Sequence, residues 1–362
     1  FAPEPGAAEQ WAEAAAAAGM RYAVLTTRHH NGFSLWPSAV SDWSIGQFLP
    51  GRDLVREFID AFRAAGLAVG FYYSLSDWHH PDYPAFTEAD KPYSFLAYRR
   101  PEHPAAWDRY LEYLFAQVRE LLTDYGDVAL LWFDGQWERT PWEWKAEELR
   151  AMIRELQPDC LVNDRLPFQG DFETPEQFVP AEPPDGRWET CLTMNRSWGY
   201  VPADTRYKSA RDLIHTVCET AGRGGNLLLN VSPRGDGSLP PEQLERLATV
   251  GEWVAAHGEA IYGTTAGLAP WQFSGPSTRR GDTTYLHLLM RPYDTVTVRG
   301  VPIRRVAGVR HVPSGRELTV RTRASAVDEL FNADPMGEAI IEVPADLVDE
   351  HATVLALDIN PS

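Results

Sequence analysis

Short apolar runs alternate with amphipathic segments over the first two thirds of the chain. Residues 7–19 are predicted to form a helix that ends at Gly19, and Tyr22–Thr27 is a run of apolar and β-branched residues typical of a buried strand. Apolar residues recur at helical spacing within Arg52–Ala65, and Leu67–Tyr73 predicts the next strand. The pattern therefore indicates strands and helices in alternation.

The same alternation continues to residue 257. Further strands are predicted at Val128–Phe133, Cys160–Asn163, Trp188–Thr193 and Asn226–Val231, and further helices at about 105–125, at Pro141–Leu156, at about Ser209–Ala221 and at about Pro241–His257. Uninterrupted apolar strands separated by helices are typical of parallel strands that are covered on both faces. So many units favour a (β/α)-barrel over an open sheet, and catalytic groups of such barrels follow the strands.

After about Gly263 the helical periodicity ends. Short alternating runs follow, separated by Gly, Pro and Asp, at Thr284–Met290, Thr295–Arg299, Val306–Val312, Glu317–Arg321, Ala339–Val343 and Val354–Ile359. This pattern predicts an antiparallel β-sandwich. We therefore expect a catalytic barrel domain over residues 1–262 and a sandwich domain over residues 263–362.

Composition narrows the classes of function. The 33 Lys and Arg residues against 51 Asp and Glu give a net charge of −18, which repels phosphate backbones, so no nucleic-acid partner is expected. No apolar run approaches the ~18 residues that cross a bilayer, so no membrane partner is expected.

The three cysteines, Cys160, Cys191 and Cys218, are too widely spaced to indicate a disulfide framework or a zinc site. No secretion signal is visible, but the sequence starts at Phe1, so the compartment is left open. Aromatic residues make up 12% of the chain, which fits either core filling or stacking on sugars.

Chemistry-bearing side chains follow the predicted strands. His29 and His30 come after Tyr22–Thr27, where hydrogen bonding to a polar ligand is favoured over metal binding and over a structural role. Tyr72 and Tyr73 close the next strand, and at least one of them should point into the barrel mouth.

A carboxylate ends the most apolar strand. Asp134 follows Val128–Phe133, and burying it is costly unless it has a function or a partner. Capping of a helix is the alternative, but no helix is predicted directly after it, because Gly135–Trp137 intervenes. Arg165 adds a cation at the end of another strand, where the alternative is a surface pair with Asp164.

The loop 171–189 offers a second carboxylate. It is acidic and aromatic, and its glutamates are Glu173, Glu176, Glu182 and Glu189. Neither a phosphate-binding glycine loop nor a metal-ligand cluster accompanies them, so no metal ion and no cofactor are predicted. Two carboxylates without a metal are the equipment of a glycosidase.

Nine sequence blocks, in order, resemble those of the glycoside hydrolase family 29 α-L-fucosidases over about residues 8–262. The blocks are Thr26–Phe33 with Leu35-Trp36, Arg52–Val55, Gly70–Ser74, Leu131–Gly135, Asn163–Arg165, Asp171–Glu176, Arg187–Cys191, Gly224–Val231 and Asp236-Gly237. The resemblance implies an α/β fold, an irregular (β/α)8-like, TIM-type barrel followed by an antiparallel β-sandwich. It also implies a retaining fucosidase with a fucosylated oligosaccharide or glycoconjugate as substrate.

The resemblance further implies roles for individual residues. Asp134 matches the nucleophile, and Glu176 matches the general acid/base, with Glu189 as the second candidate. Residues that match those holding the fucose ring and its hydroxyls are His29, His30, Tyr72, Trp132 and Arg165. Trp198 matches an aromatic residue that packs on the C5 methyl group.

One departure from the family concerns the start of the chain. Members begin the barrel with a strand that ends in His-Trp-Gly, and this sequence has no such segment, so we expect the first strand to be missing and to lie upstream. A retaining glycosidase of the same fold with another sugar preference and a non-catalytic glycan-binding fragment remain alternatives. The oligomeric state is left open.

Overall fold

The computed structural model describes residues 1–85, 104–167 and 169–361. These residues divide into two compact units. Unit 1 comprises Phe1–Thr174 and Pro233–Leu239, and unit 2 comprises Pro175–Ser232 and Pro240–Ser362. Each unit is described separately.

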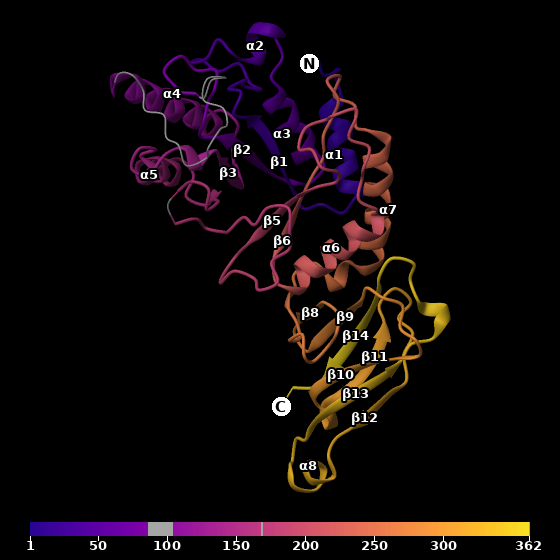
Figure 1. The fold of residues 1–362 in the computed structure, drawn as a ribbon. Coiled ribbons are helices and arrows are strands. Elements are labelled where there is room, and N and C mark those ends of the chain that lie inside the picture. Colours follow the sequence, from indigo (N-terminus) through magenta and orange to yellow (C-terminus); the bar gives the residue numbers. More distant parts are fainter. Residues whose placement is uncertain (86–103, 168, 362) are drawn as a thin grey trace. The chain divides into compact units, whose positions relative to one another are not determined.

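Unit 1 is built on a sheet of four parallel strands in the order β1-β2-β3-β4. The strands are β1 (Tyr22–Arg28), β2 (Ala68–Ser74), β3 (Leu130–Asp134) and β4 (Leu161–Val162). Helix α1 (Ala7–Ala17) precedes β1, and the helices between the strands are α2 (Ile45–Phe48), α3 (Leu54–Ala64), α4 (Pro104–Thr123), the 3-10 helix η2 (Gln136–Glu138) and α5 (Ala146–Leu156). Strands and helices thus alternate as the sequence pattern predicts (Figure 1).

The side chains of β2 and β3 alternate between the hydrophobic core of unit 1 and the opposite face of the sheet. Alternate residues of the two strands pack into the core, namely Phe71 and Tyr73 of β2 with Leu131 and Phe133 of β3, together with apolar residues of α3, α4 and α5. Because successive side chains of a strand point to opposite faces, the residues between them point away from these helices. Tyr72 and Trp132 therefore share the opposite face of the sheet.

One predicted helix begins later than expected. Helix α5 begins at Ala146 rather than at Pro141, because Lys145 has a left-handed backbone with φ of 48° that interrupts helical geometry. The preceding residues form turns in which the Glu143 carboxylate accepts hydrogen bonds from the backbone and the hydroxyl of Thr140.

Unit 2 contains one parallel pair of strands and two antiparallel sheets. The parallel pair is β5 (Glu189–Thr193) and β6 (Asn226–Asn230), followed by their helices α6 (Ala210–Gly222) and α7 (Pro241–His257) and by η3 (Gly258–Ala260). The smaller antiparallel sheet has three strands in the order β10 (Thr295–Pro302), β13 (Met336–Glu342) and β12 (Val320–Arg323). The larger one has five strands in the order β11 (Val306–His311), β14 (Thr353–Ile359), β9 (Thr283–Leu288), β8 (Ser277–Arg280) and β7 (Thr265–Ala266). The remaining short helices are η4 (Ile303–Arg305), α8 (Ala326–Phe331) and η5 (Ala345–Leu347).

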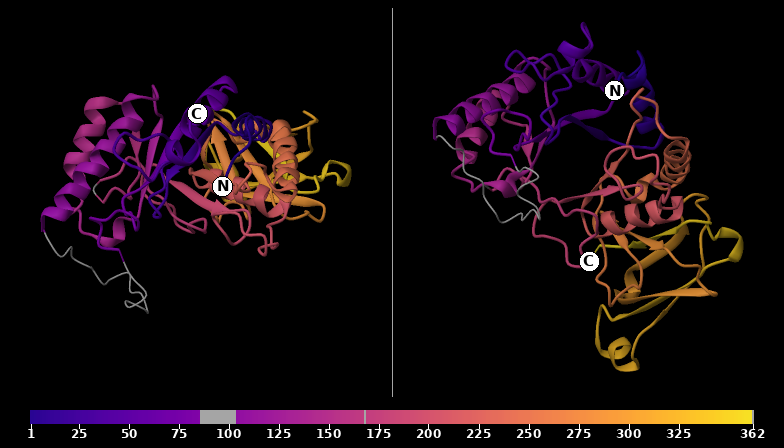
Figure 2. Two further views of the ribbon diagram at one scale, coloured as in Figure 1. Left: turned by 90° about the horizontal axis from the view of Figure 1, so that it is seen from above. Right: turned by 45° about the horizontal axis from the view of Figure 1, so that its top comes forward.

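The two antiparallel sheets enclose a common core, to which β9, β10, β11, β13 and β14 all contribute. Helix α8 connects β12 to β13 at one end of the smaller sheet (Figures 1 and 2). The strand predicted at Glu317–Arg321 begins only at Val320. Glu317 and Leu318 pair with β11 instead, through a bridge to Arg310 and a hydrogen bond from Leu318 N to Val309 O, so the chain crosses here from one sheet to the other.

The structure confirms an α/β chain with a parallel sheet and separate antiparallel sheets. Within the described ranges, the parallel strands are hydrogen-bonded as one sheet of four and one pair, so the complete barrel stays a prediction.

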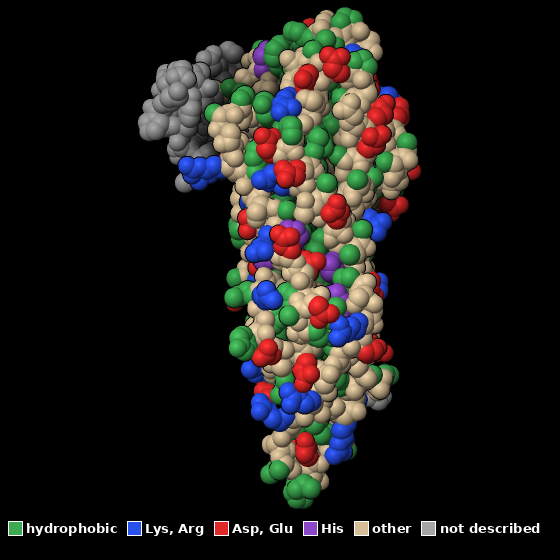
Figure 3. All heavy atoms as spheres, turned by 90° about the vertical axis from the view of Figure 1, so that its right-hand side faces the viewer, with side chains coloured by type: hydrophobic (Ala, Val, Ile, Leu, Met, Phe, Trp, Pro, Cys, Tyr) green, Lys and Arg blue, Asp and Glu red, His purple; other side chains and the backbone are tan. Residues whose placement is uncertain are grey.

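Among the helices that the structure describes, none is long and apolar enough to span a membrane. On the face in Figure 3, positive and negative side chains are interspersed. The expectation of no nucleic-acid partner stays a prediction.

Candidate active site

The carboxylate of Asp134 lies at the carboxyl end of β3 and is held at both oxygens. The hydroxyl of Tyr72 donates to Oδ2 at 2.7 Å, and Arg165 Nη1 donates to Oδ1 at 3.0 Å. Only 8% of Asp134 is exposed, so these two donors replace hydration that burial removes. Tyr72 and Arg165 come from β2 and from the loop after β4, and the carboxylate is therefore fixed by both neighbouring strands.

Four flat groups form a stack across the sheet. The ring of Tyr72 lies 5.5 Å from that of His29 at an interplanar angle of 5°, and 5.7 Å from that of Trp132 at 19°. The Arg165 guanidinium lies over the ring of Trp132, 4.5 Å from its centroid. Strand register brings Tyr72 and Trp132 together, since Tyr72 of β2 pairs with Trp132 of β3. The sequence named all four residues as candidates, and the structure places them side by side.

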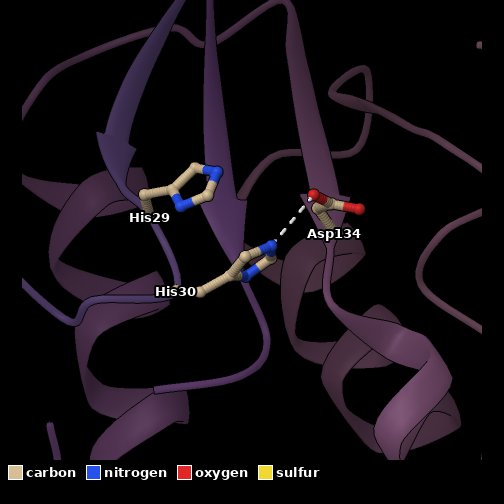
Figure 4. Close-up of side chains that lie close together, drawn as sticks. All are labelled: His29, His30 and Asp134. Atoms are coloured by element: carbon tan, nitrogen blue, oxygen red, sulfur yellow. Dashed lines mark ion pairs between the residues drawn. The ribbon is translucent and has the colours of Figure 1, made fainter. Parts of the chain in front are cut away.

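His30 contacts the same carboxylate from the β1 side (Figure 4). Its Nε2 lies 3.5 Å from Asp134 Oδ2, and its Nδ1 lies 2.5 Å from Ser74 Oγ and 3.0 Å from Ser76 Oγ. Burial lowers the pKa of His30 to about 4, with the neighbouring His29 acting in the same direction and Asp134 opposing it. The imidazole is therefore neutral near pH 7.

The helix-capping alternative for Asp134 is wrong. A helix does begin sooner than the sequence indicated, the 3-10 helix η2 at Gln136, but its N-cap is Gly135 and no side chain caps it. The pairing of Arg165 with Asp164 is wrong as well. Arg165 binds Asp134, whereas Asp164 Oδ1 accepts a hydrogen bond from the hydroxyl of Thr174.

A buried ion pair connects the end of β1 to the loop after β2. Arg28, the last residue of β1, donates from Nη1 to Asp77 Oδ2 at 3.0 Å, and both side chains are almost fully buried. Asp77 Oδ1 in turn accepts the backbone N–H groups of His79 and His80. The residue after His30 and Asn31 must be glycine, because Gly32 has φ of +76° and a β-carbon there would lie 2.2 Å from Asp77 Oδ1.

The remaining candidates belong to unit 2. Glu176 is half-buried and pairs with Cys191 in the middle of β5, through the adjacent bonds Gln177 N to Cys191 O and Cys191 N to Pro175 O. Glu189 is buried at the amino end of the same strand. Trp198 is 40% exposed, and its carbonyl accepts from Asn230 at the carboxyl end of β6.

Three ligand atoms of His29, His30 and Asp134 lie within 4.8 Å of one another. Two neutral imidazoles and a carboxylate are a donor set that suits zinc or a similar ion. The Arg165 guanidinium, 3.0 Å from Asp134 Oδ1, places a positive charge beside the same carboxylate and opposes a cation there. The absence of a metal stays a prediction.

Comparison with known proteins decides the family. The family model for Alpha-L-fucosidase matches residues 1–259. The chain belongs to this family. Solved fucosidases also share its structure: an α-L-fucosidase isoenzyme from Paenibacillus thiaminolyticus is 38% identical, with a TM-score of 0.87 over 100% of this chain and 88% of that one.

Two further members of the family bear on function. A GH29 α-L-fucosidase from Bacteroides thetaiotaomicron, solved as a trapped covalent intermediate, is 26% identical with a TM-score of 0.83, over 98% of this chain and 82% of that chain. The tissue α-L-fucosidase of Mus musculus is 35% identical over 280 residues, which is 73% of this chain. The chain spans 57% of the length of that mouse relative.

Several residues of this fucosidase-family site were missed from the sequence. Ser74 and Ser76, whose hydroxyls contact His30, lie directly after the strand predicted at Leu67–Tyr73. This position after a strand was a signal that could have identified them. The pairing of Arg28 with Asp77 had no such signal, because the two residues are 49 positions apart. Two tryptophans whose rings pack beside His30, Trp78 and Trp137, were also missed.

Proposed function

We propose that the protein is a retaining α-L-fucosidase, which hydrolyses terminal α-L-fucosyl residues of fucosylated oligosaccharides or glycoconjugates through a covalent fucosyl-enzyme intermediate. The observation that carries this proposal is the buried Asp134 carboxylate at a strand end, held by Tyr72 and Arg165 beside a stack of flat groups. Membership of the α-L-fucosidase family supports it.

In the first step, an Asp134 oxygen attacks the anomeric carbon and the bond to the leaving-group oxygen breaks. Glu176 donates its proton to that oxygen, so the aglycone leaves as an alcohol and the sugar becomes an ester of Asp134. The donors on Asp134 orient the carboxylate for attack.

In the second step, Glu176 takes a proton from water, and the water oxygen attacks the anomeric carbon. The ester bond breaks and Asp134 returns as a carboxylate. Two inversions at one carbon leave the α configuration unchanged. Glu176 is preferred to Glu189 because Glu189 stands at the amino end of β5, whereas catalytic groups of parallel α/β folds gather at the carboxyl ends.

The remaining assignments follow the same proposal. His29, His30, Tyr72, Trp132 and Arg165 hold the fucose hydroxyls and ring, and Trp198 packs on the C5 methyl group, where an apolar surface favours a 6-deoxy sugar. We also propose a (β/α)-barrel over residues 1–262 and a β-sandwich over 263–362. The change from parallel to antiparallel pairing after β6 and the match of the family model to residues 1–259 support that boundary.

The test is hydrolysis of matched aryl glycosides. We expect release of nitrophenol from 4-nitrophenyl α-L-fucopyranoside and little from 4-nitrophenyl β-D-galactopyranoside. Proton NMR of the early reaction should show α-L-fucose before mutarotation. Preference for the galactoside would assign another sugar, β-L-fucose as first product would contradict retention, and binding of L-fucose without turnover would identify a glycan-binding protein.

A further inference from the structure

The hydroxyls of Ser74 and Ser76 lie under the imidazole of His30. Ser74 Oγ is 2.5 Å from His30 Nδ1 and 2.7 Å from the carbonyl oxygen of Ser76. Ser76 Oγ is 3.0 Å from the same ring nitrogen and 3.2 Å from Ser74 Oγ. Both serines are fully buried, so their hydrogens must be used within this group.

Counting hydrogens fixes the direction of each bond. The buried carbonyl oxygen of Ser76 only accepts, and the Ser74 hydroxyl lies 2.7 Å from it, so we assign the single hydrogen of that hydroxyl to Ser76 O. Ser74 Oγ then has only lone pairs left for His30 Nδ1, and this ring nitrogen must carry the hydrogen. Ser76 Oγ can accept from the same N–H and donate to Ser74 Oγ. Donation from Ser76 Oγ to Nδ1 would instead leave Ser74 Oγ and Nδ1 2.5 Å apart with no hydrogen between them, which is repulsive.

The tautomer decides what the other ring nitrogen can do. With the hydrogen on Nδ1, the neutral ring presents a bare lone pair at Nε2, 3.5 Å from Asp134 Oδ2. Two acceptors cannot hydrogen-bond to each other. The His30 edge that faces Asp134 is therefore able to accept a hydrogen bond from a ligand and unable to donate one.

The backbone after Asp134 keeps the serine pair in place. Gly135 has φ of +76°, and a β-carbon on it would lie 2.5 Å from Ser76 Oγ. The amide of Leu75, between the two serines, donates to the carbonyl of Asp134 at 2.7 Å. The pair is thus fixed to both the histidine and the carboxylate strand.

We propose that Ser74 and Ser76 are positioning residues that hold His30 in the Nδ1–H tautomer, so that Nε2 accepts a hydrogen bond from a sugar hydroxyl. The proposal rests on the fucosidase function above and extends it. The site then selects a ring hydroxyl as a donor, and an isosteric fluorine at that carbon is rejected because it has no hydrogen to give.

The first test measures the tautomer without any assay of activity. In the chain labelled with ¹⁵N-histidine, long-range ¹H–¹⁵N spectra at pH 7 should show His30 with a protonated Nδ1 and an unprotonated Nε2, and His30→Gln identifies its signals. In Ser74→Ala the hydrogen should distribute over both nitrogens. A wild-type ring that carries its hydrogen on Nε2, or on both nitrogens, overturns the proposal.

The second test measures recognition of the hydroxyl. Calorimetry should give a dissociation constant about 10- to 100-fold higher for one of the 2-, 3- and 4-deoxyfluoro analogues of L-fucose than for L-fucose itself. In Ser74→Ala most of that difference should disappear. Equal discrimination in both proteins overturns the proposal.

A matched control is Ser34→Ala. Ser34 is also fully buried, but its Oγ accepts from Gln117 and does not touch His30. This variant should keep both the His30 tautomer and the preference for the hydroxyl, whatever stability it loses. If the wild-type chain binds L-fucose but releases no nitrophenol, the proposed catalytic function is wrong. The NMR measurement of the His30 tautomer and the dissociation constants of the fluoro analogues still test the present proposal.

Discussion

Arg28 and Asp77 form a buried ion pair with 3.0 Å between Nη1 and Oδ2, although they lie 49 positions apart in the sequence. Asp77→Asn keeps the shape but leaves the guanidinium without its counter-charge, so the free energy of unfolding should fall by about 3 to 5 kcal/mol. Urea denaturation measures this. The matched control is Asp346→Asn, which removes the partner of Arg316 in an exposed pair and should cost less than about 1 kcal/mol. Equal losses in both variants would contradict the importance of burial.

Gly135→Ala should reduce activity more than the same substitution at another glycine with a left-handed backbone. Its β-carbon would meet Ser76 Oγ at 2.5 Å and shift the support of His30, so kcat should fall about 100-fold. Gly66→Ala is the control, because Gly66 has the same φ of +76° with nothing within 4 Å of the added carbon. It should lose stability but keep kcat. Similar kcat values in the two variants would count against the contact with Ser76.

Asp134→Gly should lower kcat/KM for an aryl α-L-fucoside by at least about 10³-fold, because no other carboxylate takes over the covalent step. Added azide should restore turnover in part by attacking in the vacated space. The product should then be β-L-fucosyl azide, since only one inversion occurs. A variant with near-normal activity would place the nucleophile elsewhere.

The acid/base assignment predicts a dependence on the leaving group. Glu176→Ala should reduce kcat/KM on a fucosyl disaccharide by about 10²- to 10⁴-fold and much less on a nitrophenyl fucoside, whose leaving group needs little protonation. Glu189→Ala should lower stability, because Glu189 is buried at the start of β5, with equal effects on both substrates. Glu182→Ala, on the surface, is the control. A larger leaving-group effect in Glu189→Ala would transfer the role to Glu189.

Stability should fall in acid through a histidine of unit 2. Burial lowers the pKa of His287 to about 3 from its ordinary 6.5, so above pH 6.5 the ring is neutral in both folded and unfolded chains. Between these values only the unfolded chain takes up the proton. The free energy of unfolding should therefore decrease by up to about 1.4 kcal/mol for each pH unit below 6.5.

The variant His287→Gln isolates this contribution. Glutamine can still donate to the Thr278 hydroxyl that His287 contacts at 3.1 Å, but it does not titrate. Urea midpoints measured from pH 7.5 to 4.5 should therefore depend less on pH in this variant than in the wild type. An unaltered slope in His287→Gln would contradict the assignment.

Strand ends were predictable from the sequence because the local pattern of apolar and polar residues determines them. A continuous apolar run such as Val128–Phe133 indicates its own burial, and the polar residue that follows it is then conspicuous. Contacts between residues far apart in the sequence were not predictable, since nothing near Arg28 specifies Asp77. The start of α5 was misplaced because the left-handed Lys145 interrupts a segment with good helical periodicity. The choice between Glu176 and Glu189 stayed open because both lie in one acidic stretch, and only the strand assignment distinguishes their positions.

Tyr72 and Trp132, the two members of the stack that stand on paired strands, take their spacing from the backbone. Adjacent strands lie about 4.8 Å apart, close to the separation that flat groups prefer, so hydrogen bonds of the sheet maintain this pair. Insertions or deletions in the loops after the strands leave that ladder intact. Loops other than those that carry His29 and Arg165 can therefore diversify to accept new aglycones while the sheet preserves the contact of Tyr72 with Asp134, which separates the evolution of specificity from that of catalysis.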